Sequence, residues 1–188
     1  MTTFKGYPRA DGTVGIRNHV LITSTVACSN GAVDRIARNN PGLISMVSVG
    51  GCGNSHYSPQ FNYAVENICK HPNVYATILI GLGCEDLDAQ ALADKLTKEG
   101  YRVFCRRIQL DGGSDKVCED ADRAAKQLLK EAAELHPVDC PISKLSVGFR
   151  FSDEDAYTNC LVNPAFGNVA DWLIAEGGTA VISQTPSF

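Results

Sequence analysis

Short apolar runs alternate with longer segments of helical repeat over most of the chain. The apolar runs are residues 20–26, 44–49, 76–82 and 102–108, which are rich in apolar residues, although 102–108 also contains three arginines. Such runs are typical of strands buried on both faces of a parallel sheet. The helical segments begin near residue 29 and cover residues 59–70, 87–100 and 114–135. Four βα units in succession predict the α/β class: an open parallel sheet with helices on both faces, a flavodoxin-like or Rossmann-like three-layer sandwich.

The remaining sequence flanks this pattern. Residues 1–19 contain several glycines and a proline, and are interpreted as an irregular N-terminal arm with a tight turn at Asp11 and Gly12. Residues 20–137 form the predicted α/β domain. Residues 138–188 are interpreted as a C-terminal extension, the start of a truncated or degenerate second region, in which "HPVDCPIS" is a linker before a strand–helix–strand pattern.

Three cysteines come directly after the first three apolar runs, in the stretches "TVACSN", "SVGGCGNSHY" and "GLGCED". Loops at the carboxyl ends of neighbouring parallel strands lie at one edge of the sheet, so Cys28, Cys52 and Cys84 are predicted to share a metal site. Three thiolates with an open fourth position suit zinc or an iron–sulfur cluster. The alternative is that each cysteine is a small packed hydrophobic residue.

Other residues are candidates for substrate binding. Arg17, with Asn18 beside it, is suited to hold a carboxylate through two hydrogen bonds, or is simply a surface arginine. Asn30 follows the first cysteine loop. Two consecutive glycines, Gly112 and Gly113, precede a predicted helix, where free backbone N–H groups favour anions.

His56 lies in the glycine-rich cysteine loop and is a candidate ligand or general base, with an exposed turn histidine as the alternative.

Composition narrows the classes of function. The 188 residues are 44% hydrophobic and 20% charged, with eight cysteines and a formal net charge of −4. No basic cluster or long apolar segment appears, so neither nucleic acid nor a membrane is an expected partner. Without a recognisable secretion signal, a cytoplasmic protein with free thiols or metal ligands is favoured over one with disulfides. Neither GxGxxG nor a P-loop is present, which disfavours a flavodoxin-like nucleotide binder.

Several motifs, taken in order, resemble one family. "GYPRADGTVGIRNHVLI", "GGCG", "HPNVYATILIGLGCE", "IQLDGG", "LSVGF", "NPAFG" and "EGGTAVI" are similar to segments of altronate and galactarate dehydratases and of the large subunit of sulfolactate sulfo-lyase. The resemblance implies elimination of water or sulfite from a sugar acid or small hydroxy acid, with a divalent metal, iron first. It also implies that Gln109 lines the site and that Glu85 is a catalytic carboxylate; an exposed glutamate at a helix start is the alternative for Glu85.

The sequence also departs from the family pattern. Ser48 stands where the family has a histidine before GCG, and "FSDED" replaces the usual CGGSD loop. Two hypotheses follow: a hydro-lyase or a fragment of one, and a non-catalytic relative that binds a small acid or metal, as a homo-oligomer or beside a partner subunit.

Overall fold

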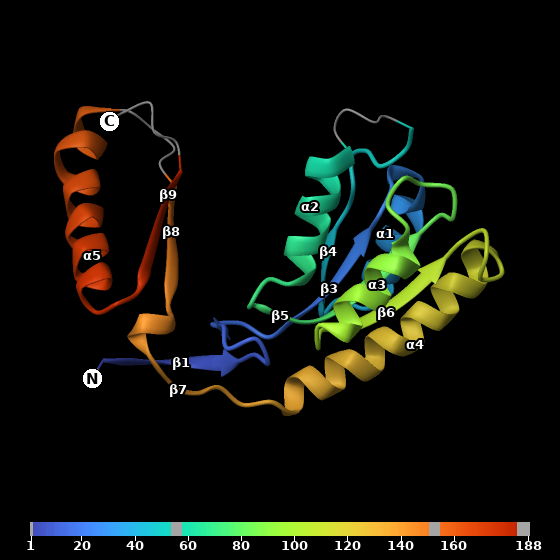
Figure 1. Cartoon of the computed structure of the whole chain (residues 1–188), viewed down its shortest axis with the longest axis horizontal. Helices are drawn as coiled ribbons and strands as arrows, with labels where there is room; N and C mark the ends of the chain where they lie inside the picture. Colours follow the sequence, from blue (N-terminus) through green and yellow to red (C-terminus); the bar gives the residue numbers. More distant parts are fainter. Residues whose placement is uncertain (1, 54–57, 151–154, 184–188) are drawn as a thin grey trace. The chain divides into compact units, whose positions relative to one another are not determined.

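A computed structural model describes residues 2–53, 58–150 and 155–183 of the chain (Figure 1). The chain divides into two compact units, one formed by Arg9–His136 and the other by Met1–Pro8 with Pro137–Phe188. None of the helices in the described residues is both long enough and apolar enough to cross a membrane.

The larger unit is built on a four-stranded parallel sheet. Its strands are β3 (His19–Ser24), β4 (Leu43–Met46), β5 (Val74–Gly81) and β6 (Arg102–Arg107), and their spatial order is β4-β3-β5-β6. All four predicted strands are present and all neighbours are parallel, which confirms the predicted class. A short strand, β2 (Val14–Gly15), precedes them.

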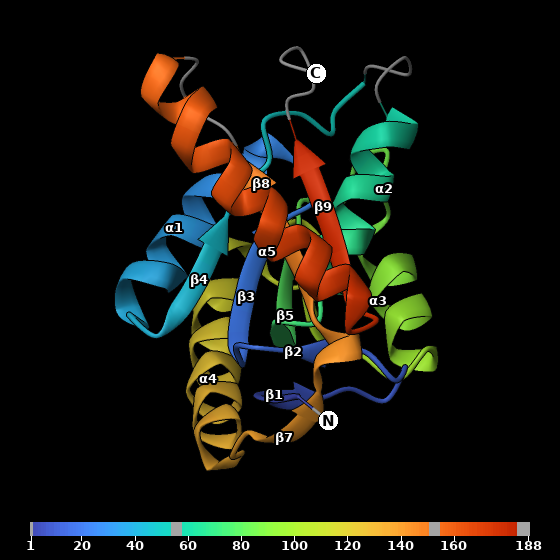
Figure 2. The same ribbon diagram turned by 90° about the vertical axis from the view of Figure 1, so that its left-hand side faces the viewer.

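Four helices cover the two faces of this sheet (Figures 1 and 2). They are α1 (Asn30–Asn39), α2 (Ser58–Cys69), α3 (Ala89–Lys98) and α4 (Gly113–Glu134), with a single turn of 3-10 helix, η1 (Ala27–Ser29), before α1. Buried residues of α1 and α4 join one hydrophobic cluster, and those of α2 and α3 join the other. The helices therefore lie on both faces, as predicted.

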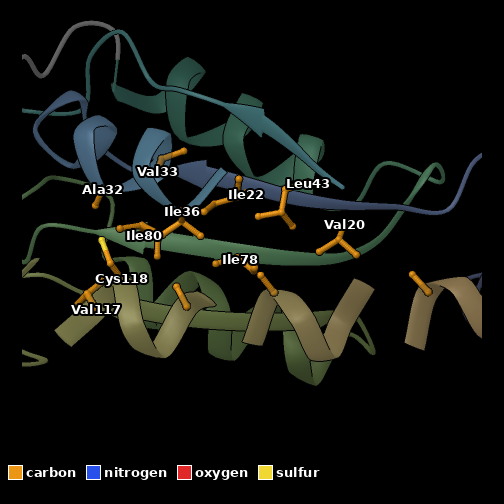
Figure 3. Packing of buried hydrophobic residues seen from close by; sticks show 13 residues of the cluster. Val20, Ile22, Ala32, Val33, Ile36, Leu43, Ile78, Ile80, Val117 and Cys118 are labelled. Atoms are coloured by element: carbon orange, nitrogen blue, oxygen red, sulfur yellow. The ribbon is translucent and has the colours of Figure 1, made fainter. Parts of the chain in front are cut away.

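The side chains of each strand point alternately to the two faces of the sheet, so the hydrophobic core has two parts, one on each face. Ile22 and Ile78 point toward α1 and α4, where they pack with Val33 and Ile36 (Figure 3). Leu79, one residue further along β5, belongs to the cluster on the opposite face. Successive side chains of a strand point to opposite faces, so a strand inside the sheet needs apolar residues at every position.

The second predicted strand differs from the structure at its end. We expected it to reach residue 49, but β4 ends at Met46 and Val49 is 97% exposed. β4 is an edge strand, and Ile44 and Met46 are also exposed. Apolar residues continue past the last residue that pairs with β3, so hydrophobicity alone overestimates the length of the strand.

The smaller unit contains the N-terminal strand and the C-terminal region. Its elements are β1 (Thr3–Pro8), β7 (Val138–Pro141), η2 (Ile142–Lys144), β8 (Ser146–Arg150), η3 (Thr158–Val162), α5 (Asn163–Ala175) and β9 (Thr179–Ser183). β8 and β9 form a two-stranded parallel sheet, and α5 lies between them in sequence.

Two interpretations of the flanking segments were wrong. The start of the predicted irregular arm is strand β1, and half of the predicted linker "HPVDCPIS" is strand β7. The two strands pair antiparallel, with Phe4 opposite Cys140. The turn at Asp11 and Gly12 is present: Gly12 has a φ of 81°, and an Asp11 carboxylate oxygen accepts a hydrogen bond from the Thr13 N–H.

Candidate functional site at the carboxyl edge of the sheet

The loops that leave the carboxyl ends of the four strands define the candidate site. The chain passes from β3 to β4 on one side and then returns to β5 on the other side of β3. The strand order therefore reverses between β3 and β5, which is the topological switch point where doubly wound sheets bind their ligands.

Glu85 joins the two loops at this point. Its Oε1 accepts hydrogen bonds from the Thr25 hydroxyl, 2.8 Å away, and from the Leu82 N–H, 3.0 Å away. Its Oε2 accepts a third hydrogen bond from the Gly83 N–H. Thr25 follows β3 and the other two residues follow β5, so one carboxylate fixes both loops to each other.

These contacts keep the Glu85 carboxylate ionised. Burial alone would raise the pKa of Glu85, but hydrogen bonds from the Gly83 N–H, its own N–H, Thr25 and the Leu82 N–H outweigh burial and lower it below the usual value. A lowered pKa makes the carboxylate a weaker proton acceptor at neutral pH. The geometry thus favours Glu85 as a positioning residue, and its predicted role as a base stays a prediction.

Two glycines make room for this arrangement. A Cβ added to Gly81 would lie 2.5 Å from Glu85 Oε1 and 2.7 Å from the Ala89 Cβ. Gly51 has a φ of 98°, and a Cβ there would lie 2.3 Å from the Thr25 carbonyl oxygen. Both contacts are shorter than real side chains tolerate, so close approach to a neighbouring segment explains Gly81 and, in the glycine-rich stretch after the second strand, Gly51.

The loop after β4 is fixed to β3 through Asn30. The Asn30 side-chain amide donates to the Ser48 carbonyl, 2.8 Å away, and its oxygen accepts from the Ser24 hydroxyl at 2.6 Å. Ser48 is buried and its N–H donates to the same Ser24 oxygen. Asn30 therefore holds the protein's own backbone in this structure; its predicted role in substrate binding stays a prediction.

A cavity of about 100 Å³ opens beside Glu85. It is lined by Gly83, Glu85, Asp88, Ala89, Arg107 and Leu110. Asp88 begins α3, where its Oδ1 accepts hydrogen bonds from the N–H groups of the first helical turn. The cavity thus contains two carboxylates and one guanidinium, and Arg107 was not among the residues that the sequence singled out.

The cysteines predicted to bind metal all lie in the loops at this edge. Cys28, Cys52 and Cys84 are exposed, so they are not packed hydrophobic residues. Gln109, from the loop after β6, contacts the Cys84 sulfur through its side-chain amide at 3.9 Å. Within the part of the chain that the structure describes, no three His, Cys, Asp or Glu side chains are grouped to bind a metal ion. As placed, these residues do not form a metal site, and the three-thiolate site stays a prediction.

Arg17 and Asn18 are placed elsewhere in the larger unit. Both precede β3, at the amino edge of the sheet and away from Glu85. The Arg17 guanidinium donates to the Ile16 carbonyl, and the Asn18 amide donates to the Ala132 carbonyl at 2.8 Å. The structure does not bring these two residues together with the other candidates, and their predicted role in substrate binding stays untested.

The paired glycines begin α4. Gly112 and Gly113 have φ values of 97° and 86°. The Gly113 N–H already donates to the Ile108 carbonyl at 2.9 Å, so it is not free for an anion. His56 lies outside the described residues.

The fold and the site together define a doubly wound α/β unit whose loops converge around an ionised glutamate. Residues 6–133 match the family described as D-galactarate dehydratase/altronate hydrolase, second domain. The chain therefore belongs to this family, as its motifs predicted.

Curated relatives agree with this assignment. The chain is 29% identical to altronate dehydratase of Bacillus subtilis, with 98% of the chain and 39% of the relative covered. It is 30% identical to the (2R)-sulfolactate sulfo-lyase subunit beta of Chromohalobacter salexigens, with 97% and 46% covered. Galactarate dehydratase (L-threo-forming) of Escherichia coli is 29% identical, with 97% and 39% covered. The chain thus spans less than half the length of these relatives.

Proposed function

We propose that the chain acts as a hydro-lyase, or as part of one, that eliminates water from a sugar acid or small hydroxy acid. The supporting observation is that the family match over residues 6–133 contains all the loops at the carboxyl edge of the sheet. Relatives named for altronate and galactarate dehydration suggest the class of substrate.

The reaction requires a base to remove the proton next to the carboxylate and an acid to help the β-hydroxyl leave. Glu85 contributes by keeping the loops after β3 and β5 in a fixed arrangement around the substrate. Glu85 and His56 are the two candidates for the base, and the lowered pKa of Glu85 favours His56.

Metal dependence is a separate proposal. A divalent metal, iron first and zinc or an iron–sulfur cluster as alternatives, would supply Lewis-acid help to the leaving hydroxyl when bound. The exposed thiols of Cys28, Cys52 and Cys84 are the candidate ligands. Metal analysis after anaerobic purification tests this proposal: Cys52→Ser should lower the iron or zinc content without unfolding the chain, and an unchanged content would remove Cys52 from the site.

A second candidate function is a binding subunit. One relative is named as a subunit, and "FSDED" stands in this chain in place of the CGGSD loop of the family pattern. These facts favour a chain that binds a small acid and works with a partner subunit or as a homo-oligomer.

One experiment separates the two. The purified chain is incubated with altronate or galactarate, with and without ferrous iron added anaerobically, and the 2-keto acid that forms when the enol product tautomerises is measured as its semicarbazone. Turnover supports the hydro-lyase. Binding of galactarate by calorimetry without turnover supports the subunit, and absence of both contradicts the proposal.

A further inference from the structure

Two adjacent arginines at the end of β6 have different surroundings. Arg106 points toward α4, where its Nε lies 3.2 Å from Asp120 Oδ2 and its guanidinium lies 4.6 Å from the centre of the Phe104 ring. Its Nη1 also donates to the Cys105 carbonyl at 2.9 Å. Arg106 therefore has its Nε, its Nη1 and its charge engaged within the protein.

Arg107 is the next residue and lines the cavity beside Glu85. Its Nε is buried and has no hydrogen-bond acceptor among the described residues. The carboxylate that pairs with it is that of Asp111, whose Oδ2 lies 3.9 Å from Nε, too far for a hydrogen bond. That oxygen already accepts a hydrogen bond from the Arg107 backbone N–H at 2.6 Å.

The other carboxylates of the cavity are engaged elsewhere. Glu85 accepts hydrogen bonds from Thr25 and from the backbone of its own loop. Asp88 Oδ1 accepts from the N–H groups of Gln90 and Ala91. The carboxylates of Glu85 and Asp88 thus have donors other than Arg107. Leaving the buried Nε of a charged group without a hydrogen bond is unfavourable, so the Arg107 guanidinium is suited to bind an anion from outside.

The size of the cavity indicates which anion fits. At about 100 Å³ it has room for roughly three water molecules, which matches a carboxylate with its neighbouring carbon. A guanidinium presents donors in a planar fork that fits a carboxylate through two hydrogen bonds.

We propose that Arg107 binds one carboxylate of the hydroxy-acid substrate in this cavity, and this inference rests on the proposed function. It assigns to Arg107 the role that the sequence suggested for Arg17. Glu85 fixes the loop that forms one wall of the cavity, while Arg107 selects an acid over the corresponding neutral polyol.

The test uses galactarate as the probe and galactitol, which has the same carbon chain without carboxylates, as its neutral counterpart. In NMR spectra of the unmodified chain, galactarate should shift the Arg107 side-chain Nε–H signal, and galactitol should not. By calorimetry, Arg107→Gln should raise the Kd for galactarate about tenfold or more, because hydrogen bonds to a charged group are lost. The matched variant Arg106→Gln should leave the Kd within about twofold.

The outcomes separate this inference from the proposed function. If galactarate shifts the Arg107 signal but no turnover is found, the carboxylate site at Arg107 is supported and the hydro-lyase proposal is contradicted. If turnover is found and Arg107→Gln leaves both the Kd and the NMR response of neighbouring residues unchanged, the hydro-lyase stands and the site at Arg107 is wrong. An equal shift with galactitol also overturns the inference, and the NMR arm does not depend on any variant folding.

Discussion

Both parallel sheets of this protein contain a strand with a run of apolar residues, but the two runs have different surroundings. In the larger unit, Ile78, Leu79 and Ile80 of β5 are all 0% exposed. In the smaller unit, the corresponding apolar pair of β9, Val181 and Ile182, is 56% and 45% exposed. Both strands have the continuous apolar pattern of a buried parallel strand, but only one of them is buried.

The number of covering elements accounts for the difference. The four-stranded sheet has two helices on each face, whereas in the described part of the smaller unit α5 is the one α-helix that accompanies β8 and β9. α5 itself exposes apolar side chains, including Trp172 at 48% and Ile174 at 57%. A parallel sheet is stable when both of its faces are covered by other elements. An apolar strand sequence therefore indicates that the strand needs covering elements, but it does not show how many helices cover it.

The largest expected effect comes from truncating one isoleucine in each sheet. Ile78→Ala should lower the free energy of unfolding by about 2–5 kcal/mol, because it leaves a cavity in a fully packed cluster. Ile182→Ala should cost less than about 1 kcal/mol, because its side chain is nearly half exposed. Urea unfolding measures both, and equal losses would show that the two sheets are packed alike.

A pair of glycine substitutions compares backbone constraint in the two units. Gly51→Ala should lower the free energy of unfolding by about 1–3 kcal/mol, because its φ is 98° and the new Cβ would lie 2.3 Å from the Thr25 carbonyl oxygen. Gly148→Ala in β8 meets no atom within 4 Å and should stabilise by up to about 1 kcal/mol. Thermal unfolding followed by circular dichroism measures both changes. A harmless Gly51→Ala would mean that the loop after β4 does not need a close approach to Thr25.

The four-stranded sheet could be predicted from the sequence because each of its strands overlaps a recognisable apolar run. Residues 76–82 are apolar at nearly every position, and the observed strand β5 covers most of that range. Strands β1 and β7 have no such signal. They contain glycine or proline, and they pair across more than 130 residues, as Phe4 opposite Cys140 shows. Pairing over that distance depends on tertiary structure and not on local pattern.

The site could be predicted only in its general location. The rule for parallel sheets placed the cysteine loops at the carboxyl edge, but it could not show that Glu85 accepts three hydrogen bonds from its surroundings. Arg107 was overlooked because two adjacent arginines are too few to form a basic cluster. The alternation along β6 was the available signal: Arg106 and Arg107 must face opposite sides of the sheet.

An intermediate effect is expected from Glu85→Gln. A glutamine places an N–H group against the Gly83 N–H, so at pH 7 we expect the free energy of unfolding to fall by about 1–2 kcal/mol. The expected loss is small because the side chain is partly exposed to solvent. The folded pKa of Glu85 lies below its usual value of 4.5, so its contribution is complete above that pH and is lost as the pH falls through the folded pKa. Urea unfolding at several pH values should therefore show the gap between the two proteins narrowing below about pH 4.5. A gap that stays constant down to pH 3 would mean that the carboxylate charge is not what holds the loops.

The smallest expected effect is at the exposed face of α5. Ile174→Gln should change the free energy of unfolding by no more than about 0.5 kcal/mol, because the isoleucine is 57% exposed and loses little packing. The same variant should weaken self-association in sedimentation experiments at rising protein concentration, because exposed apolar surface favours contact with another molecule. Lys130→Gln, at an exposed position of α4, is the control and should alter neither measurement. A loss above about 1 kcal/mol for Ile174→Gln would show that this side chain is packed within the chain, and the contrast between the two sheets would then be smaller than the exposed fractions indicate.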